Sequence, residues 1–156
     1  MDHDTLMRRA IALSLQQAVA RAGGPFGAVI ARDGKIIAEG ANCVTSGNDP
    51  TAHAEIVAIR RACASLGVFA LSDCVIYSSC EPCPMCLSAI YWARLAKLYF
   101  ANTRIEAAAI GFDDEFLYRE IPRPIEQRRL PTVCLLAAEA SEAFEVWRAD
   151  PHKVGY

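Results

Sequence analysis

The sequence predicts an α/β fold in which helices cover both faces of a mixed sheet of five strands. Apolar segments of strand length alternate with segments of helical periodicity, an order typical of a sheet between two helical layers. Asp33-Gly34 signals a two-residue hairpin turn near the start, and two strand–helix units follow it. An antiparallel hairpin joined to such units makes the sheet mixed. At 156 residues, the chain fits one domain with one core.

The first part of the chain is predicted to form a helix, a hairpin and a second helix. Asp4 or Thr5 can cap the first helix, and Gly23-Gly24-Pro25 ends it. Ser, Gly, Asn, Asp and Pro gather between the hairpin and the second helix, which indicates a loop. The expected elements are a helix over residues 4–21, strands over 26–31 and 36–39, a loop over 45–50 and a helix over 51–65.

The remaining strands and helices follow from shorter patterns. Val75-Ile76-Tyr77 and Leu98-Tyr99-Phe100 are apolar runs of the kind that buried strands use. Pro84 suits the first turn of a helix, where its missing N–H costs nothing. The expected elements are strands over residues 75–77, 98–100 and 133–136, and helices over 84–93, 105–109, 115–119 and 141–148.

Composition and charge exclude several classes of function. The hydrophobic content of 53% argues against disorder, and a net charge of −2 argues against a large phosphate-binding surface, hence against nucleic acid as a partner. No apolar run reaches the ~18–20 residues that a membrane helix needs, and the acidic Met1-Asp2-His3-Asp4 is unlike a signal peptide. We therefore expect a cytoplasmic protein without membrane contact, whose seven cysteines stay reduced.

The candidate metal ligands are His53, Cys83 and Cys86. Zinc accepts imidazole nitrogen and thiolate sulfur in tetrahedral geometry. Cys83 and Cys86 are one helical turn apart, so both sulfurs can face one point, and the helix N-terminus at Cys83 favours a thiolate. Three protein ligands leave the fourth position open, as in catalytic zinc sites.

Glu55 is the candidate catalytic residue, because it follows the histidine ligand by two positions in the predicted helix. From there its carboxylate can face a zinc-bound water and move protons without binding the metal. A closed structural site that adds Cys80 is the alternative. We favour the open site because Pro82 interrupts the Cys80–Cys83 pair and would aim Cys80 away.

His53-Ala54-Glu55 and Pro82-Cys83-Pro84-Met85-Cys86 together match the signature of the zinc nucleobase deaminases. Over nearly its full length the sequence resembles the cytidine-deaminase-like superfamily, and within it the compact bacterial guanine deaminases. The segments that carry this resemblance are residues 23–30, 48–55, 79–86, 89–94, 111–114 and 147–156. The zinc motif is specific for the superfamily, whereas residues 111–114 and the C-terminal segment carry the preference for guanine.

This resemblance implies a three-layer α/β/α sandwich, one Zn²⁺ per chain, and hydrolysis of guanine to xanthine and ammonia. It implies a homodimer in which a C-terminal segment of about residues 138–156 is exchanged and helps to cover the partner's active site. The substrate contacts that it implies are Phe26, Asn42, Ala54, Asp114 and Tyr156. Asp114 would accept hydrogen bonds from the N1–H and 2-amino edge of guanine.

Several alternatives stay open at this level. The substrate could be guanosine or another aminopurine or triazine. A tRNA adenosine deaminase shares the zinc motif but would need a basic surface around its pocket. A non-catalytic zinc module would have no use for Glu55. Asp114 could cap a turn, Phe26 could belong to the core, and Asn42 could be a turn residue.

Overall fold

The computed structural model describes residues 1–156 as two compact units, Met1–Asp114 and Glu115–Tyr156. The first unit contains the sheet, the helices that pack on it and the candidate site. Its elements are α1 (His3–Ala20), β1 (Gly27–Arg32), β2 (Lys35–Ala41), α2 (Val44–Gly47), α3 (Ala54–Leu66), β3 (Val75–Cys80), α4 (Pro84–Trp92), β4 (Lys97–Asn102) and α5 (Arg104–Ala109).

The sheet has four strands in the order β2-β1-β3-β4. β1 runs antiparallel to both β2 and β3, and β3 runs parallel to β4, so the prediction of a mixed sheet is confirmed. The hairpin turn between β1 and β2 lies at Asp33 and Gly34, whose φ angles are 50° and 72°. Two consecutive left-handed residues are what a tight hairpin turn requires, which explains the Asp-Gly pair.

The predicted fifth strand is wrong. Residues 133–136 belong to the second unit, which contains no strand with which they could pair. Val133 and Leu135 are 77% and 79% exposed, and Leu136 adopts a left-handed φ of 54° immediately before a helix. β-Branched and apolar residues favour an extended backbone, but a strand also needs a neighbour for its ladder of hydrogen bonds.

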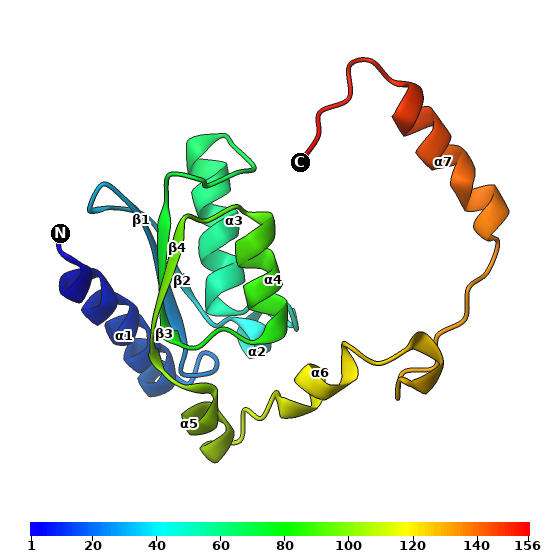
Figure 1. Ribbon diagram of the computed structural model, residues 1–156. Coiled ribbons are helices and arrows are strands. Elements are labelled where there is room, and N and C mark those ends of the chain that lie inside the picture. Colours follow the sequence, from blue (N-terminus) through cyan, green and yellow to red (C-terminus); the bar gives the residue numbers. More distant parts are fainter. The chain divides into compact units, whose positions relative to one another are not determined.

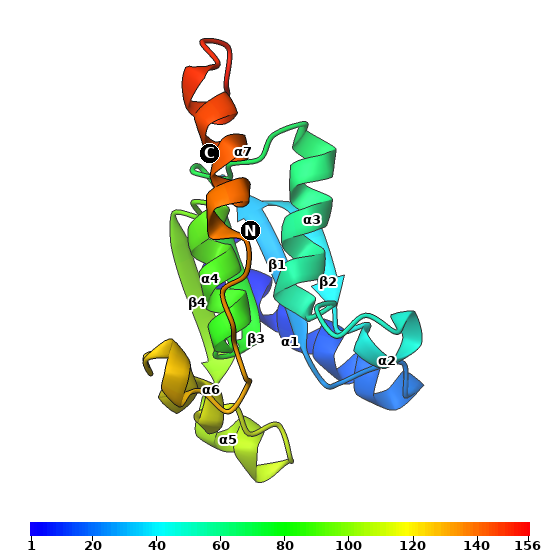
Figure 2. The ribbon, with the colours of Figure 1, turned by 90° about the vertical axis from the view of Figure 1, so that its right-hand side faces the viewer.

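Helices cover both faces of the sheet, α1 on one face and α3 with α4 on the other (Figures 1 and 2). Successive residues of β1 alternate between the two layers, because side chains on a strand point to opposite faces. The α1 layer buries Leu6, Ala10, Val29, Ala31 and Tyr77. The opposite layer includes Ala28, Ile30, Ala54, Ala58, Ile76 and Ile90.

Helices α1, α3, α5 and α7 (Ala137–Ala149) begin at residues other than those predicted. For α1 and α3 the shift has a local cause. The side chain of Asp2 accepts a hydrogen bond from the Thr5 N–H, so Asp2 caps α1. Asp49 accepts bonds from the N–H and hydroxyl of Thr51, which keeps Thr51 in the loop and delays α3 until Ala54.

Gly40 on β2 sets how closely α3 approaches the sheet. A Cβ at this position would lie 2.1 Å from the carbonyl oxygen of Ala54, the first residue of α3. Only glycine permits that approach. The contact holds the start of α3, with His53 and Glu55, against the sheet.

The second unit consists of α6 (Glu115–Glu120), the 3₁₀ helix η1 (Ile125–Gln127) and α7 (Ala137–Ala149). Side chains about one helical turn apart form ion pairs in these helices, such as Arg119–Glu115 in α6 and Arg148–Glu145 in α7. None of its residues is buried, and apolar side chains such as Phe144 and Trp147 are exposed. In neither unit is a helix both long enough and apolar enough to span a membrane.

Candidate metal centre

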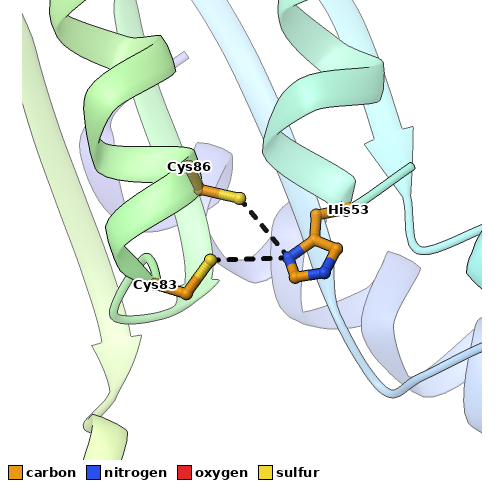
Figure 3. A group of neighbouring side chains, drawn as sticks. All are labelled: His53, Cys83 and Cys86. Atoms are coloured by element: carbon orange, nitrogen blue, oxygen red, sulfur yellow. Dashed lines mark hydrogen bonds between the residues drawn. The ribbon is translucent and has the colours of Figure 1, made fainter. Parts of the chain in front are cut away.

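The starts of α3 and α4 bring the three predicted ligands together. His53 is the residue before α3, and Cys83 is the residue before α4; both have an extended backbone, and neither side chain caps its own helix. Cys86 lies one turn further along α4 and is fully buried. Figure 3 shows both sulfur atoms facing Nδ1 of His53.

The spacing of these donor atoms fits a zinc ion. The His53 Nδ1 atom lies 3.6 Å from Cys83 Sγ and 3.5 Å from Cys86 Sγ, and the donor atoms of all three residues lie within 4.8 Å of one another. Zn–N and Zn–S bonds of about 2.0 and 2.3 Å at a tetrahedral angle would place nitrogen and sulfur ~3.5 Å apart. The group therefore matches the donor set and dimensions of a zinc site with three protein ligands.

The two thiols are electrostatically coupled. A hydrogen bond from Cys86, followed by one from His53, lowers the pKa of the Cys83 thiol to about 4. The same contact raises the pKa of Cys86, with burial as the next cause. The hydrogen bond with Cys83 also raises the pKa of His53. Negative charge therefore concentrates on sulfur at a helix N-terminus, which suits a cation-binding site.

Cys80 does not join this group. Its thiol donates to the carbonyl oxygen of Thr103 at 3.7 Å, and burial raises its pKa to about 11. A structural zinc site is closed by four protein ligands. The three-donor arrangement of His53, Cys83 and Cys86 is instead that of an open site.

Glu55 lies in the first turn of α3, and its side chain is buried. The Ser78 hydroxyl on β3 donates to Glu55 Oε1 at 3.0 Å. Burial raises the pKa of the Glu55 carboxyl. His53, Cys83 and Cys86 together are called the metal group below. A carboxyl with a raised pKa beside such a group can hold and release a proton nearer to neutral pH.

Asn42, at the end of β2, is buried and held in one orientation. Its Oδ1 atom accepts hydrogen bonds from the N–H groups of Gly24 and Val44, each at 3.2 Å. The Gln17 Nε2 donates to the Asn42 carbonyl oxygen at 2.5 Å. Because the side-chain oxygen is engaged by the backbone, the amide nitrogen is the end that Asn42 can offer to a ligand.

The other predicted substrate contacts lie on several separate segments of the chain. Phe26 packs edge-to-face against Phe112, with ring centroids 4.8 Å apart. Burial, followed by the charge of Cys83, raises the pKa of Asp114. Ala54 is buried at the start of α3. Tyr156 belongs to the second unit.

Sequence reasoning missed two residues in this region, Ser78 and Phe112. Ser78 lies in the polar continuation of β3 beyond the predicted strand of residues 75–77. The available signal was a pair of serines directly after a buried strand, since buried hydroxyls require partners. Phe112 lies within residues 111–114, which carry the resemblance, but its contact with Phe26 joins distant parts of the chain and has no local signal.

Comparison with known proteins places the chain among deaminases. Residues 1–102 match the family model described as the cytidine and deoxycytidylate deaminase zinc-binding region. The guanine deaminase of Bacillus subtilis (strain 168) is 51% identical over 156 residues, which cover 100% of both chains. A tRNA-specific adenosine deaminase of Agrobacterium fabrum is 43% identical over 86 residues, or 55% of this chain and 57% of that one.

Solved structures show the same likeness. The X-ray structure of guanine deaminase from Bacillus subtilis superposes with a TM-score of 0.97 at 51% sequence identity, covering 100% of this chain and 99% of that chain. The α/β arrangement of four strands and its flanking helices is therefore the fold of these deaminases.

Proposed function

The chain belongs to the cytidine and deoxycytidylate deaminase family of zinc-binding enzymes, and we propose that within this family it is a guanine deaminase, which hydrolyses guanine to xanthine and ammonia. The observation that carries this proposal is the likeness to the Bacillus subtilis guanine deaminase over both whole chains. That likeness continues past residue 102, where the family model ends, and so includes Asp114 and the C-terminal segment.

His53, Cys83 and Cys86 would hold one zinc ion, as their donor atoms and spacing favour. When bound with one position open, zinc lowers the pKa of a water molecule toward ~7 and so supplies a nucleophile at neutral pH. Glu55 would take the proton of that water. It would deliver that proton to the ring nitrogen beside C2 as the oxygen adds to C2. It would then carry the remaining hydroxyl proton to the amino group, which leaves as ammonia when the C2–N bond breaks.

The remaining residues would bind and orient the purine. Asp114 would accept from the donor edge of guanine, and Asn42 would donate through its amide nitrogen. The Phe26 ring would contact the purine plane, with Phe112 packed edge-on behind it. The buried start of α3 at Ala54 would frame the amino group that leaves.

The C-terminal segment supports a homodimer. Phe144, Val146 and Trp147 on α7 are 74%, 66% and 49% exposed, and their unit has no core of its own. Apolar side chains of this size gain stability when another surface covers them. A second copy that exchanges residues 138–156 would cover them, and Tyr156 would then serve the partner's site. The seven free thiols suit the reducing cytoplasm.

A panel of guanine, guanosine, cytosine and adenine tests the substrate. The purified, zinc-loaded protein should convert guanine to xanthine. Chromatography detects the xanthine, and an assay of released ammonia gives the rate. It should act far more slowly on the other three compounds. Absence of xanthine from guanine would contradict the proposal, and faster turnover of guanosine would move the substrate to the nucleoside.

Transfer RNA is the competing substrate, because the zinc-binding part also matches a tRNA-specific adenosine deaminase over about half of each chain. The net charge of −2 disfavours it, since binding of a phosphate backbone relies on Lys and Arg. Transfer RNA that stays bound at low salt, or inosine formed in tRNA, would support this alternative.

A further inference from the structure

We propose that Ser78 is a positioning residue for Glu55: its hydroxyl holds one carboxylate oxygen and so leaves the other free to move protons. This inference rests on the proposed function, because it assigns Ser78 a part in the same reaction. Its evidence is the hydrogen bond from Ser78 on β3 to Glu55 in the first turn of α3. Ser78 is neither a candidate metal ligand nor part of the family signature.

The contact is direct and buried. Ser78 Oγ lies 3.0 Å from Glu55 Oε1, and Ser78 and Glu55 are 2% and 6% exposed. Ser78 lies in the middle of the sheet, paired with Ala28 on β1 and with Phe100 on β4. Strands on both sides hold its backbone, so the hydroxyl is a rigid support for the carboxylate.

Ser78 supplies a donor that does not depend on the metal. A cysteine that binds zinc does so as a thiolate and has no proton to donate. The Ser78 hydroxyl binds no metal and keeps its proton, so it can donate to Glu55 Oε1 with or without zinc.

A hydroxyl suits a carboxyl group that gains and loses a proton. It can donate to a carboxylate oxygen and equally to the carbonyl oxygen of the protonated acid. With Oε1 held in this way, rotation of the carboxyl group is restricted and Oε2 carries the mobile proton. Because small misplacements of reacting groups are costly, loss of this support should reduce turnover more than binding.

Ser78→Ala tests the proposal, with Ser78→Thr as the conservative variant and Tyr77→Phe as the matched control. Tyr77 precedes Ser78 on the same strand but faces α1, where its hydroxyl contacts His3 at 2.6 Å. Tyr77→Phe therefore removes a hydrogen bond from β3 without touching Glu55. All variants are purified with zinc and compared for metal content, thermal unfolding, kcat and KM with guanine.

We expect Ser78→Ala to bind one zinc and to lose about 10- to 100-fold in kcat, the range typical for loss of a hydrogen-bond partner that orients a metal ligand. Its KM should change less than about threefold. Ser78→Thr should recover most of kcat, and Tyr77→Phe should keep the parent kcat while unfolding at a lower temperature.

Two outcomes overturn the assignment of Ser78. A zinc-loaded Ser78→Ala protein with the parent's kcat would show that Glu55 needs no such support. An equal loss of kcat in Tyr77→Phe would show that any weakening of β3 has the same effect. Both outcomes differ from failure of the proposed function, in which the parent enzyme itself forms no xanthine from guanine.

Discussion

His53 and Cys83 each stand one residue before a helix, and their donor atoms lie 3.6 Å apart. The backbone has already turned into an extended conformation at these positions, so each side chain leaves its helix axis and reaches toward the other. Two helix starts packed on one face of the sheet thus build the metal group, with Cys86 supplied from the next turn of α4.

The first prediction concerns the metal. Cys83→Ala should lose zinc and turnover together, because two remaining ligands bind zinc weakly. Zinc at about 1,000 times its dissociation constant stabilises a protein by ~4 kcal/mol, so the free energy of unfolding should fall by a similar amount. Metal analysis, an activity assay with guanine and denaturant unfolding measure these three effects. Cys80→Ser is the control and should keep its zinc; a Cys83→Ala protein with one zinc per chain would refute the ligand assignment.

The second prediction separates metal binding from proton transfer. Glu55→Gln keeps the shape of the side chain but removes its proton-carrying oxygen. It should bind one zinc per chain and lose about 10²- to 10⁴-fold in kcat with guanine, the range typical of general acid–base catalysis. Metal analysis and steady-state kinetics check it. Full activity would remove Glu55 from the reaction.

The third prediction concerns substrate choice at Asp114. Asp114→Asn replaces an acceptor pair by one acceptor and one donor, which leaves a donor of guanine unpaired. A buried unpaired group costs ~3 kcal/mol, so kcat/KM for guanine should fall by about 10²-fold. Asp113→Asn changes the exposed neighbour in the same way and should have little effect. Equal losses in both variants would argue against a specific contact from Asp114.

The hairpin and the metal group could be predicted because each depends on a local pattern. Asp33-Gly34 adopts two left-handed residues wherever it forms such a turn, and the spacing of Cys83 and Cys86 is one turn of helix. Ser78 depends on distant partners instead. Its partner Glu55 lies 23 positions earlier in the chain, and the fold brings the two side chains within hydrogen-bonding distance. No local pattern encodes that contact.

The fourth prediction is a pH dependence of stability at the α1–β2 contact. Arg9 donates from Nε and Nη2 to the two oxygens of Glu39 at 2.6 and 2.7 Å. These bonds lower the pKa of Glu39. A lowered pKa in the folded state stabilises the fold above the ordinary pKa of Glu, ~4.3, and this contribution is lost as pH falls through the lowered value.

Glu39→Gln should therefore reduce the free energy of unfolding by about 1 kcal/mol at pH 7, a partly exposed pair being screened by solvent. Denaturant titrations should show the difference from the parent shrinking below pH ~4. The control Glu145→Gln removes an exposed pair with Arg148 within α7 and should change little. A difference that stays constant from pH 7 to pH 3 would contradict an ionic origin.

The fifth prediction tests whether Tyr156 serves the partner subunit. Glu55→Gln and Tyr156→Ala should each be nearly inactive as homodimers. In a mixed dimer, the Tyr156→Ala subunit keeps its own Glu55 and receives an intact Tyr156 from the other chain. One complete site results. Co-expression should therefore restore about a quarter of the parent's activity, since half of randomly assembled dimers are mixed and each holds one working site.

Light scattering should show dimers of every variant in this experiment, so that assembly itself is not in question. The control pairs Glu55→Gln with Cys83→Ala, because both changes damage the site of their own chain at the metal centre. A mixed dimer of this pair still contains one site with intact Glu55 but without a complete metal group, and one with zinc but without Glu55. Restoration with Tyr156→Ala but not with Cys83→Ala would require that Tyr156 acts across the interface, whereas no restoration in either pair would place Tyr156 in the site of its own chain.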